Sequence, residues 1–103
     1  MSRAFSAPAF LLLLAGCGAP APTERFANAM QYQVGKRADD PKALRNLYPD
    51  LRGSSRPLSN GNSEEEFLVR PHCAVWFEID ARSRTISKWR LDSKRNEDCD
   101  LPL

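Results

Sequence analysis

The stretch that decides the fold is Cys73-Ala74-Val75-Trp76-Phe77-Glu78-Ile79-Asp80. Its odd-numbered residues, from Cys73 to Ile79, are apolar, and alternate residues of a strand share one face, so the run predicts a strand with an apolar side. A polar turn over residues 81–84 and a second strand-forming run, TISKWRL at 85–91, follow directly. The two runs together predict an antiparallel hairpin near the end of the chain.

The register of this hairpin depends on the length of its loop. A four-residue loop at 81–84 places Ile79 opposite Ile86 and Trp76 opposite Trp89. A loop of three or five residues would instead bring Trp89 onto the face of Val75, because a shift of one residue turns every side chain over. We expect the first register, because residues 80 and 85 then flank the loop symmetrically. This register places both tryptophans on the sheet face away from Val75.

A second hairpin is predicted upstream. Asn60-Gly61 is a strong signal for a tight turn, and it separates a segment near 55–59 from a β-prone segment near 64–70. Pro57 lacks a backbone N–H and therefore restricts the first segment to a sheet edge. The four segments predict a meander of three or four antiparallel strands.

Two short helices are predicted before the strands. Thr23 is a suitable N-cap for the first helix, and Phe26, Met30 and Val34 recur at helical spacing before Gly35. The second helix is expected to begin at Asp40-Pro41, with residues 44 and 47 facing inward, and to stop at residue 49. The predicted fold is therefore α+β, with two short N-terminal helices packed on the meander.

The first sixteen residues have the layout of a secretory signal. Arg3 supplies a positive charge, residues 4–15 are mostly apolar, and small residues precede Cys17. The apolar stretch is too short to span a bilayer. A buried N-terminal helix is the alternative, and Pro8 argues against it.

Leu14-Ala15-Gly16-Cys17 resembles the lipobox of bacterial lipoproteins at all four positions. This resemblance implies a signal peptide at 1–16, a lipidated Cys17 carrying fatty acids such as palmitate, a Pro/Ala tether over 17–23, and a domain over 24–103. More than one fatty chain gives durable membrane anchoring. Gly18 is not the aspartate that retains such proteins in the inner membrane, so the family rule implies an outer-membrane anchor with the domain in the periplasm.

If Cys17 is lipidated, Cys73 and Cys99 remain as an even pair in an oxidising compartment, where a disulfide is expected. A metal site and a catalytic cysteine are the competing interpretations. His72 is the single histidine of the chain, and no CxxC or HxH spacing accompanies it. Neighbouring residues of a strand also point to opposite faces, which argues against a Cys73–His72 catalytic pair.

The order of elements is similar to that of small outer-membrane-assembly lipoproteins of the SmpA/OmlA (BamE-like) kind. The chain also resembles uncharacterised proteobacterial envelope lipoproteins that end in a cysteine-bracketed hairpin. The residues behind the second resemblance are Gly35-Lys36, Asn60-Gly61, Cys73, 77–80, 86–90 and Cys99. The first family supports the machinery that inserts β-barrels, so an assembly role is what that resemblance implies.

Charge and motifs point away from several function classes. The 15 Lys and Arg against 13 Asp and Glu give a formal net charge of +2, which is too even to suggest a nucleic-acid binder. The acidic run at 64–66 is expected to be solvated surface or to protect the neighbouring apolar strand from aggregation. No phosphate loop or catalytic serine motif is present in the sequence. We therefore expect no enzyme, no cofactor, no metal and no small-molecule substrate.

A binding role is left as the expectation. Basic residues gather around the last hairpin, at positions 82, 84, 88, 90, 94 and 95. Cross-strand pairing with nearby acids is the first interpretation, and contact with an anionic lipid or protein surface is the second. In the expected register Trp76, Trp89, Lys88 and Arg90 form a partner-binding patch. The alternative is that the helices pack on the tryptophan face, or that one tryptophan lies under the chain after residue 91. The predicted function is a lipid-anchored accessory protein acting through protein–protein interaction, and the alternative is an inhibitor or immunity protein against a secreted hydrolase.

Overall fold

The computed structural model describes residues 22–100. The expected signal peptide, the lipidated Cys17 and most of the tether lie outside the described residues. The elements, in chain order, are α2 (Glu24–Gln33), α3 (Leu44–Leu47), the 3-10 turn η2 (Pro49–Leu51), β1 (Arg52–Pro57), β2 (Ser63–Arg70), β3 (Cys73–Ile79) and β4 (Ile86–Asn96).

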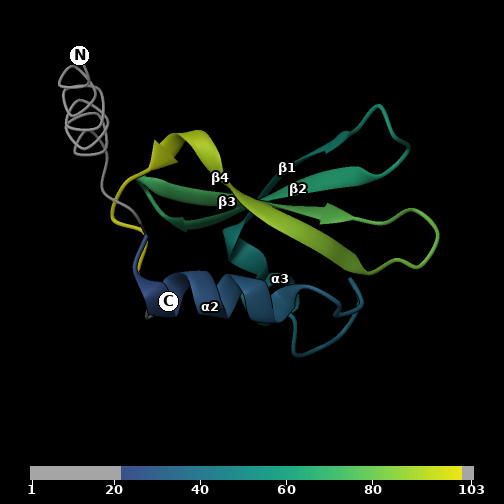
Figure 1. Cartoon of the computed structure of the whole chain (residues 1–103), viewed down its shortest axis with the longest axis horizontal. Helices are drawn as coiled ribbons and strands as arrows, with labels where there is room; N and C mark the ends of the chain where they lie inside the picture. The colour runs from purple at the N-terminus through teal and green to yellow at the C-terminus, as the bar shows by residue number, and fades with distance from the viewer. Residues whose placement is uncertain (1–21, 101–103) are drawn as a thin grey trace, which may run out of the picture.

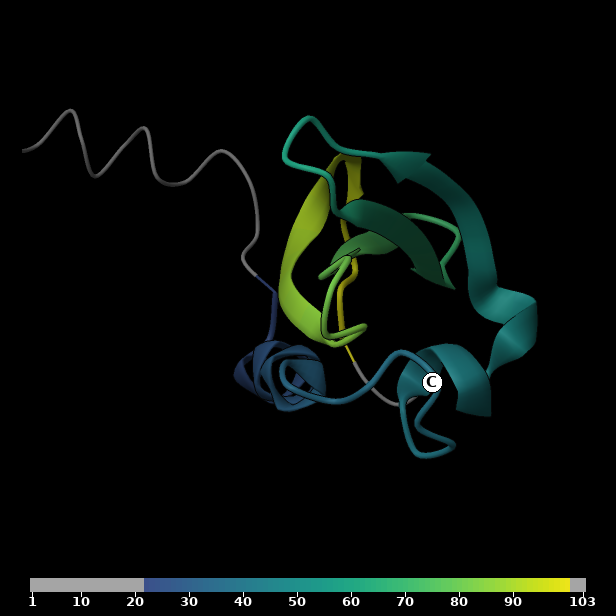
Figure 2. The ribbon, with the colours of Figure 1, turned by 90° about the vertical axis from the view of Figure 1, so that its right-hand side faces the viewer.

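The four strands form one antiparallel sheet in the order β1-β2-β3-β4 (Figure 1). The predicted α+β class and the meander are confirmed. Gly61 closes the β1–β2 hairpin at a φ of +92°, a conformation that glycine adopts without strain. The view along the sheet in Figure 2 shows a strong twist, with α2 and α3 on the same side of the strands.

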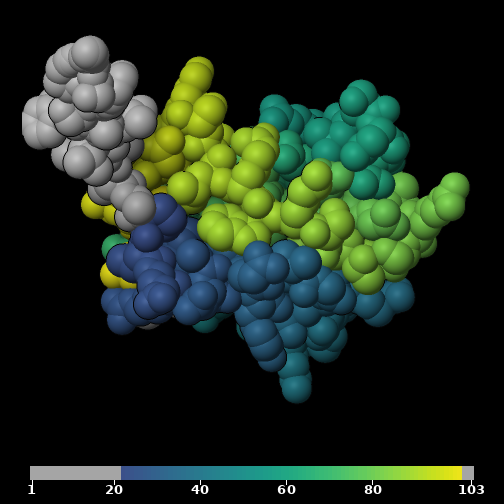
Figure 3. All heavy atoms as spheres, viewed as in Figure 1, coloured from purple at the N-terminus to yellow at the C-terminus, as the bar shows by residue number. Residues whose placement is uncertain are grey.

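Helix α2 begins where the sequence predicts, because the Thr23 side chain accepts a hydrogen bond from the Phe26 N–H at 3.3 Å. Phe26 and Met30 are fully buried on its inner face. The helix lies against β4, as the contact between the blue and light-green surfaces in Figure 3 shows. One helix therefore covers much of the sheet face that carries Val75 and Phe77.

The expected second helix is largely replaced by turns, so the prediction of two packed helices is wrong. Only the single turn α3 is helical, and Leu47, expected inside, is 54% exposed. Asp40 does cap this region, but its carboxylate accepts from the Lys42 N–H in a tight turn instead of starting a helix at Pro41. The Asn46 side chain then donates to the carbonyl oxygens of residues 38 and 40, which fixes the turns in place.

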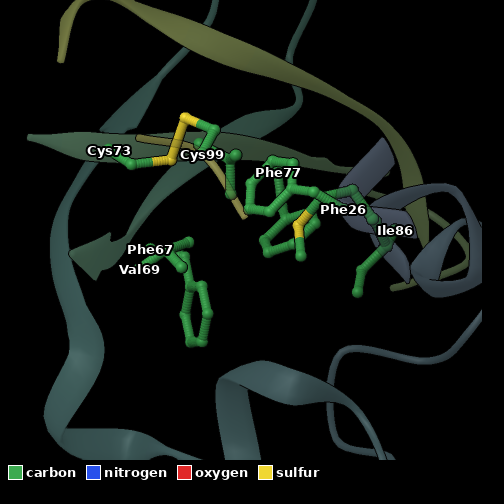
Figure 4. Packing of buried hydrophobic residues seen from close by; sticks show 9 residues of the cluster. Phe26, Phe67, Val69, Cys73, Phe77, Ile86 and Cys99 are labelled. Carbon is green, nitrogen blue, oxygen red and sulfur yellow. A yellow bond between two sulfur atoms is a disulfide. The ribbon is translucent and has the colours of Figure 1, made fainter. Parts of the chain in front are cut away.

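The apolar core lies between α2 and the sheet. Its largest fully buried side chains include Phe26, Phe67 and Phe77, and the last two rings pack at 6.0 Å between centroids. The Cys73–Cys99 disulfide borders this cluster (Figure 4), with the two Cα atoms 5.3 Å apart. The predicted disulfide is therefore present, and it joins the start of β3 to the segment after β4.

A β-bulge changes the register of the last hairpin. Ile79 lies opposite Ile86 as expected, but Glu78 pairs with Lys88, so Ser87 is the extra residue. The Ser87 hydroxyl donates to the carbonyl oxygen of residue 78 at 3.3 Å. Beyond the bulge the expected register is wrong by one residue.

The bulge separates the two tryptophans. Trp89 lies opposite Phe77 on the core face, where its ring meets Phe26 edge-on at 6.3 Å between centroids. Trp76 pairs with Arg90 on the other face. The expected patch with both tryptophan rings side by side therefore does not form.

Helix α2 is attached to the end of the described chain by several hydrogen bonds. The Thr23 N–H donates to the Cys99 carbonyl oxygen at 3.2 Å, and the Thr23 hydroxyl donates to Asp100 at 2.7 Å. Arg25 donates to both carboxylate oxygens of Asp100 at 2.8 and 3.0 Å. We call this group, together with Cys73, the N-terminal clamp. It connects the first residues of α2 to the disulfide.

Candidate functional site

The sheet face opposite α2, here called the outer face, is polar and charged. Strand alternation places on it one or more residues from every strand. These residues are Arg56, Glu64, Glu66, Leu68, Ala74, Trp76, Glu78, Lys88, Arg90 and Asp92. Most of its charged side chains form ion pairs or hydrogen bonds with one another.

Trp76 lies at the centre of the outer face and is only 7% exposed. The guanidinium carbons of Arg56 and Arg90 lie 4.4 and 5.5 Å from its ring centroid, within range of cation–π attraction. Its indole N–H donates to Asp92 at 2.8 Å. Trp76 is therefore buried beneath arginine side chains, and no helix within residues 22–100 covers it.

Glu64 links the two arginines that cover Trp76. It accepts hydrogen bonds from Arg56 at 3.0 Å and from Arg90 at 2.8 Å, so one carboxylate on β2 connects β1 with β4. The hydrogen bonds from Arg90 hold the pKa of Glu64 below its usual value, although burial acts in the opposite direction. The same contact raises the pKa of Arg90. Both partners remain charged over the physiological pH range.

Glu78 has a different set of partners beside this group. Asn62 and Asn60, in the β1–β2 loop, donate to one of its carboxylate oxygens at 2.8 and 3.1 Å. These two amide donors lower the pKa of Glu78. The Lys88 ammonium lies 3.8 Å from the other oxygen, beyond hydrogen-bond distance.

Asp92 connects the far end of β4 to Trp76. One of its oxygens accepts from Trp76, and the other accepts from the backbone N–H groups of Lys94 and Arg95 at 2.9 and 2.8 Å. These donors, Trp76 first, lower the pKa of Asp92 to about 2. The carboxylate therefore orders the strand end and the indole together.

A pocket of about 310 Å³ opens on the outer face. Its lining comes from all four strands and from the loop after β1. The lining residues are Arg56, Leu58, Glu64, Trp76, Glu78, Lys88, Trp89 and Arg90. We call it the Trp76 pocket.

The acidic run at 64–66 is not the solvated surface that the sequence suggested. Glu64 and Glu65 are 5% and 7% exposed, and they point to opposite faces of β2. On the core side Glu65 accepts hydrogen bonds from Arg45 and Arg52. Burial raises the pKa of Glu65, and the two arginines outweigh that effect and leave it lowered.

The basic residues around the last hairpin divide into two groups. Lys88 and Arg90 pair across strands with Glu78 and Glu64, as the first interpretation predicted. Within residues 22–100, the side chains of the other four, Arg82, Arg84, Lys94 and Arg95, have no ion pair within 4.0 Å. All four are exposed, and Lys94 and Arg95 lie at the far end of β4.

All four predicted partner-binding residues are among those that line the Trp76 pocket. The indole of Trp89, however, turns to the core face and donates to Gln31 at 3.2 Å, so the two tryptophan rings do not form one patch. Arg56, Glu64 and the two asparagines were missed by the sequence analysis. They come from β1, β2 and their loop, and only the three-dimensional sheet places them beside the last hairpin.

No group of three or more histidine, cysteine or acidic side chains within residues 22–100 is arranged to hold a metal ion. Within the same range, no helix has the length and apolar character needed to cross a membrane. His72 lies exposed in the turn between β2 and β3.

Comparison of the chain with protein-family models, with curated proteins and with solved structures found no match.

Proposed function

We propose that this chain is a lipid-anchored protein of the bacterial envelope whose folded domain acts by binding another protein. The observation that carries the proposal is Leu14-Ala15-Gly16-Cys17, a lipobox-like sequence at the end of a short apolar stretch. Lipidation of Cys17 would hold the domain at a membrane surface. The family rule for the residue after the cysteine favours the outer membrane and a domain in the periplasm.

The Cys73–Cys99 disulfide supports export. Disulfides persist in oxidising compartments such as the periplasm and are rare in the reducing cytosol. A domain of about 80 residues also buries a small core, and covalent cross-links commonly supplement such cores. The disulfide and the lipobox are separate features of the sequence that point to the same compartment.

The outer face supports a binding role without catalysis. Glu64 and Glu78 are each held by two or more donor side chains, which keeps them ionised and positioned. Such carboxylates stabilise a shaped surface, whereas a general acid–base catalyst needs a proton affinity tuned near the working pH. The proposed role is an assembly or structural accessory, in keeping with the resemblance to assembly lipoproteins.

Metabolic labelling tests the anchor. Cells expressing the full chain are grown with a radioactive or clickable palmitate, and the wild-type protein is expected to incorporate the label and to fractionate with the outer membrane. The variant Cys17→Ala is expected to lose the label completely and to accumulate as uncleaved precursor. Cys99→Ser is the matched control, because it removes a cysteine and the disulfide but leaves the lipobox intact, so it should keep the label.

Incorporation of label into Cys17→Ala, or processing of that variant with unchanged membrane association, would contradict the anchor. The binding role is tested by chemical cross-linking in intact envelopes, followed by mass spectrometry. An assembly role predicts resident envelope proteins among the products. A single one-to-one complex with a secreted hydrolase would instead identify an inhibitor or immunity protein.

A further inference from the structure

The negative side chains of the Trp76 pocket are buried and its positive side chains are exposed. The carboxylates of Glu64 and Glu78 are buried, at 6% and 9% exposed side-chain surface. The cationic side chains of Arg56, Lys88 and Arg90 are 53%, 69% and 43% exposed. An approaching molecule therefore meets three positive groups at the rim before it reaches either negative group.

The cationic side chains at the rim have N–H groups that make no hydrogen bond within residues 22–100 and can donate to another molecule. Arg56 uses Nε and one terminal nitrogen on Glu64, and its Nη1 has no hydrogen-bond partner among residues 22–100. The Lys88 ammonium, 3.8 Å from Glu78, is also outside hydrogen-bond distance of that carboxylate. Carboxylates bind such donors through short, charge-assisted hydrogen bonds.

The pocket also has apolar lining and limited room. Leu58 and Trp76 contribute carbon surface beside the charged groups. Its volume of about 310 Å³ lies at the lower end of the roughly 300–1,000 Å³ of small-molecule sites. A single apolar side chain of a peptide fits this description better than an extended ligand.

We propose that the Trp76 pocket is the docking site of a partner protein segment in which carboxylates flank one apolar side chain. The apolar side chain enters against Leu58 and the small part of Trp76 that the arginine side chains leave exposed, and the flanking Asp or Glu side chains pair with Arg56 and Lys88 at the rim. This inference rests on the proposed function, because it names the face and the class of partner for protein binding. A concave site with apolar lining favours a peptide over a lipid surface, which would contact protruding cations on a flat or convex face.

The test uses the full chain, purified in a non-ionic detergent, and three blocked pentapeptides. The acidic peptide is Asp-Glu-Leu-Glu-Asp. Its neutral counterpart is Asn-Gln-Leu-Gln-Asn, and Asp-Glu-Ala-Glu-Asp lacks the large apolar side chain. Binding is followed by NMR at the indole N–H of Trp76, which donates to Asp92 beside the pocket. The acidic Leu peptide is expected to shift this signal, with at least about fivefold weaker binding of the other two peptides.

Two double variants test where the acidic peptide binds. Arg56→Gln combined with Lys88→Gln removes two rim charges and is expected to weaken the acidic peptide at least about fivefold. Lys94→Gln combined with Arg95→Gln removes the same net charge at the far end of β4 and should leave binding within about twofold. Raising the salt concentration from about 0.05 M to about 0.5 M should weaken wild-type binding, because exposed charges are screened.

Equal weakening in the two double variants, or an unmoved Trp76 signal, would overturn the inference. A signal that responds to vesicles containing anionic phospholipid and not to the peptide would also overturn it and would assign the rim to a membrane surface. Envelope cross-linking of the same variants separates this result from the proposed function. A partner captured equally by wild type and by Arg56→Gln/Lys88→Gln leaves the binding role intact and rejects this pocket as its site.

Discussion

The two faces of the sheet are closed by different interactions. On the core face, α2 and the disulfide cover a cluster of apolar side chains, among them Phe26, Phe67 and Phe77. On the outer face no helix covers the strands in the described chain (Figures 1 and 2), and Trp76 is nevertheless 7% exposed. Arginine side chains and their carboxylate partners cover that ring instead.

The difference shows how a domain with one helical layer can bury residues on both sides of a sheet. Apolar burial involves no charge to screen and no group to titrate, so it responds little to pH or to moderate concentrations of a simple salt such as sodium chloride. A cover made of ion pairs is sensitive to both and contributes less per contact, since exposed pairs are worth about 0–1 kcal/mol. The two faces should therefore respond differently to substitution, salt and acid.

The largest effect is expected on the core face. Phe26→Ala removes a fully buried ring and its edge contact with Trp89, and should lower the free energy of unfolding by about 4 kcal/mol. Urea titration followed by circular dichroism measures this change. Tyr32→Ala on the same helix is the control, because Tyr32 is 71% exposed, and it should cost about 0.5 kcal/mol. Similar losses for the two variants would show that α2 does not seal this face.

An intermediate effect is expected at the centre of the outer face. Trp76→Phe keeps an aromatic ring but loses the hydrogen bond to Asp92 and part of the cation–π attraction, and should cost about 2 kcal/mol. Trp89→Phe is the matched control. It loses an exposed 3.2 Å hydrogen bond to Gln31 and should cost about 1 kcal/mol or less. A reversed order of the two losses would contradict the register beyond the bulge.

The smallest effect concerns acid. The pKa of Asp92 is about 2 in the folded protein against 3.8 as a reference, so its stabilising contribution is complete above about pH 4 and is lost as the pH falls toward 2. Asp92→Asn should cost about 1 kcal/mol or less at neutral pH, and its difference from wild type should shrink between pH 4 and 2. Thermal melts across this range measure it.

The control for the acid experiment is Asp39→Asn. Asp39 pairs with Arg37 at an exposed site, where solvent screens the charges, so its substitution should change the acid profile less than Asp92→Asn does. A difference between wild type and Asp92→Asn that stays constant down to pH 2 would show that Asp92 does not stabilise the outer face through its charge.

Much of the sheet was predictable from local sequence. The predicted strand from Cys73 to Asp80 forms β3, which ends one residue earlier at Ile79, and Asn60-Gly61 lies in the turn between β1 and β2. These features depend on alternation and turn chemistry, which are properties of neighbouring residues. The disulfide was predictable because only two cysteines remain once Cys17 is assigned to the lipobox.

The register beyond residue 79 was not predictable in the same way. The loop at 81–84 has the expected length, with the Asp80 N–H donating to the Thr85 carbonyl oxygen at 2.8 Å. One extra residue, Ser87, then turns Trp89 toward Phe26. The gain from packing that ring on α2 comes from tertiary structure, and nothing in the hairpin sequence itself marks the bulge.

The candidate site was predicted in part for a related reason. Trp76, Lys88 and Arg90 belong to the hairpin that the sequence singled out, and they do line one pocket. Arg56 and Glu64, on β1 and β2, complete that pocket, and they precede Trp76 by 20 and 12 residues in the sequence. The acidic run gave no sign of being buried. The pairing of distant charges depends on strand order, which local patterns do not encode.

The N-terminal clamp has a mechanical consequence for the lipid anchor that we propose at Cys17. Any pull on the anchor enters the domain at Thr23, whose backbone and hydroxyl are hydrogen-bonded to Cys99 and Asp100. From Cys99 the load passes through a covalent bond to the first residue of β3, a central strand of the sheet. The force therefore acts on β3, a central strand, before it separates an edge strand from its neighbour. The Trp76 pocket, built from the strands themselves, would keep its shape while the tether is under tension.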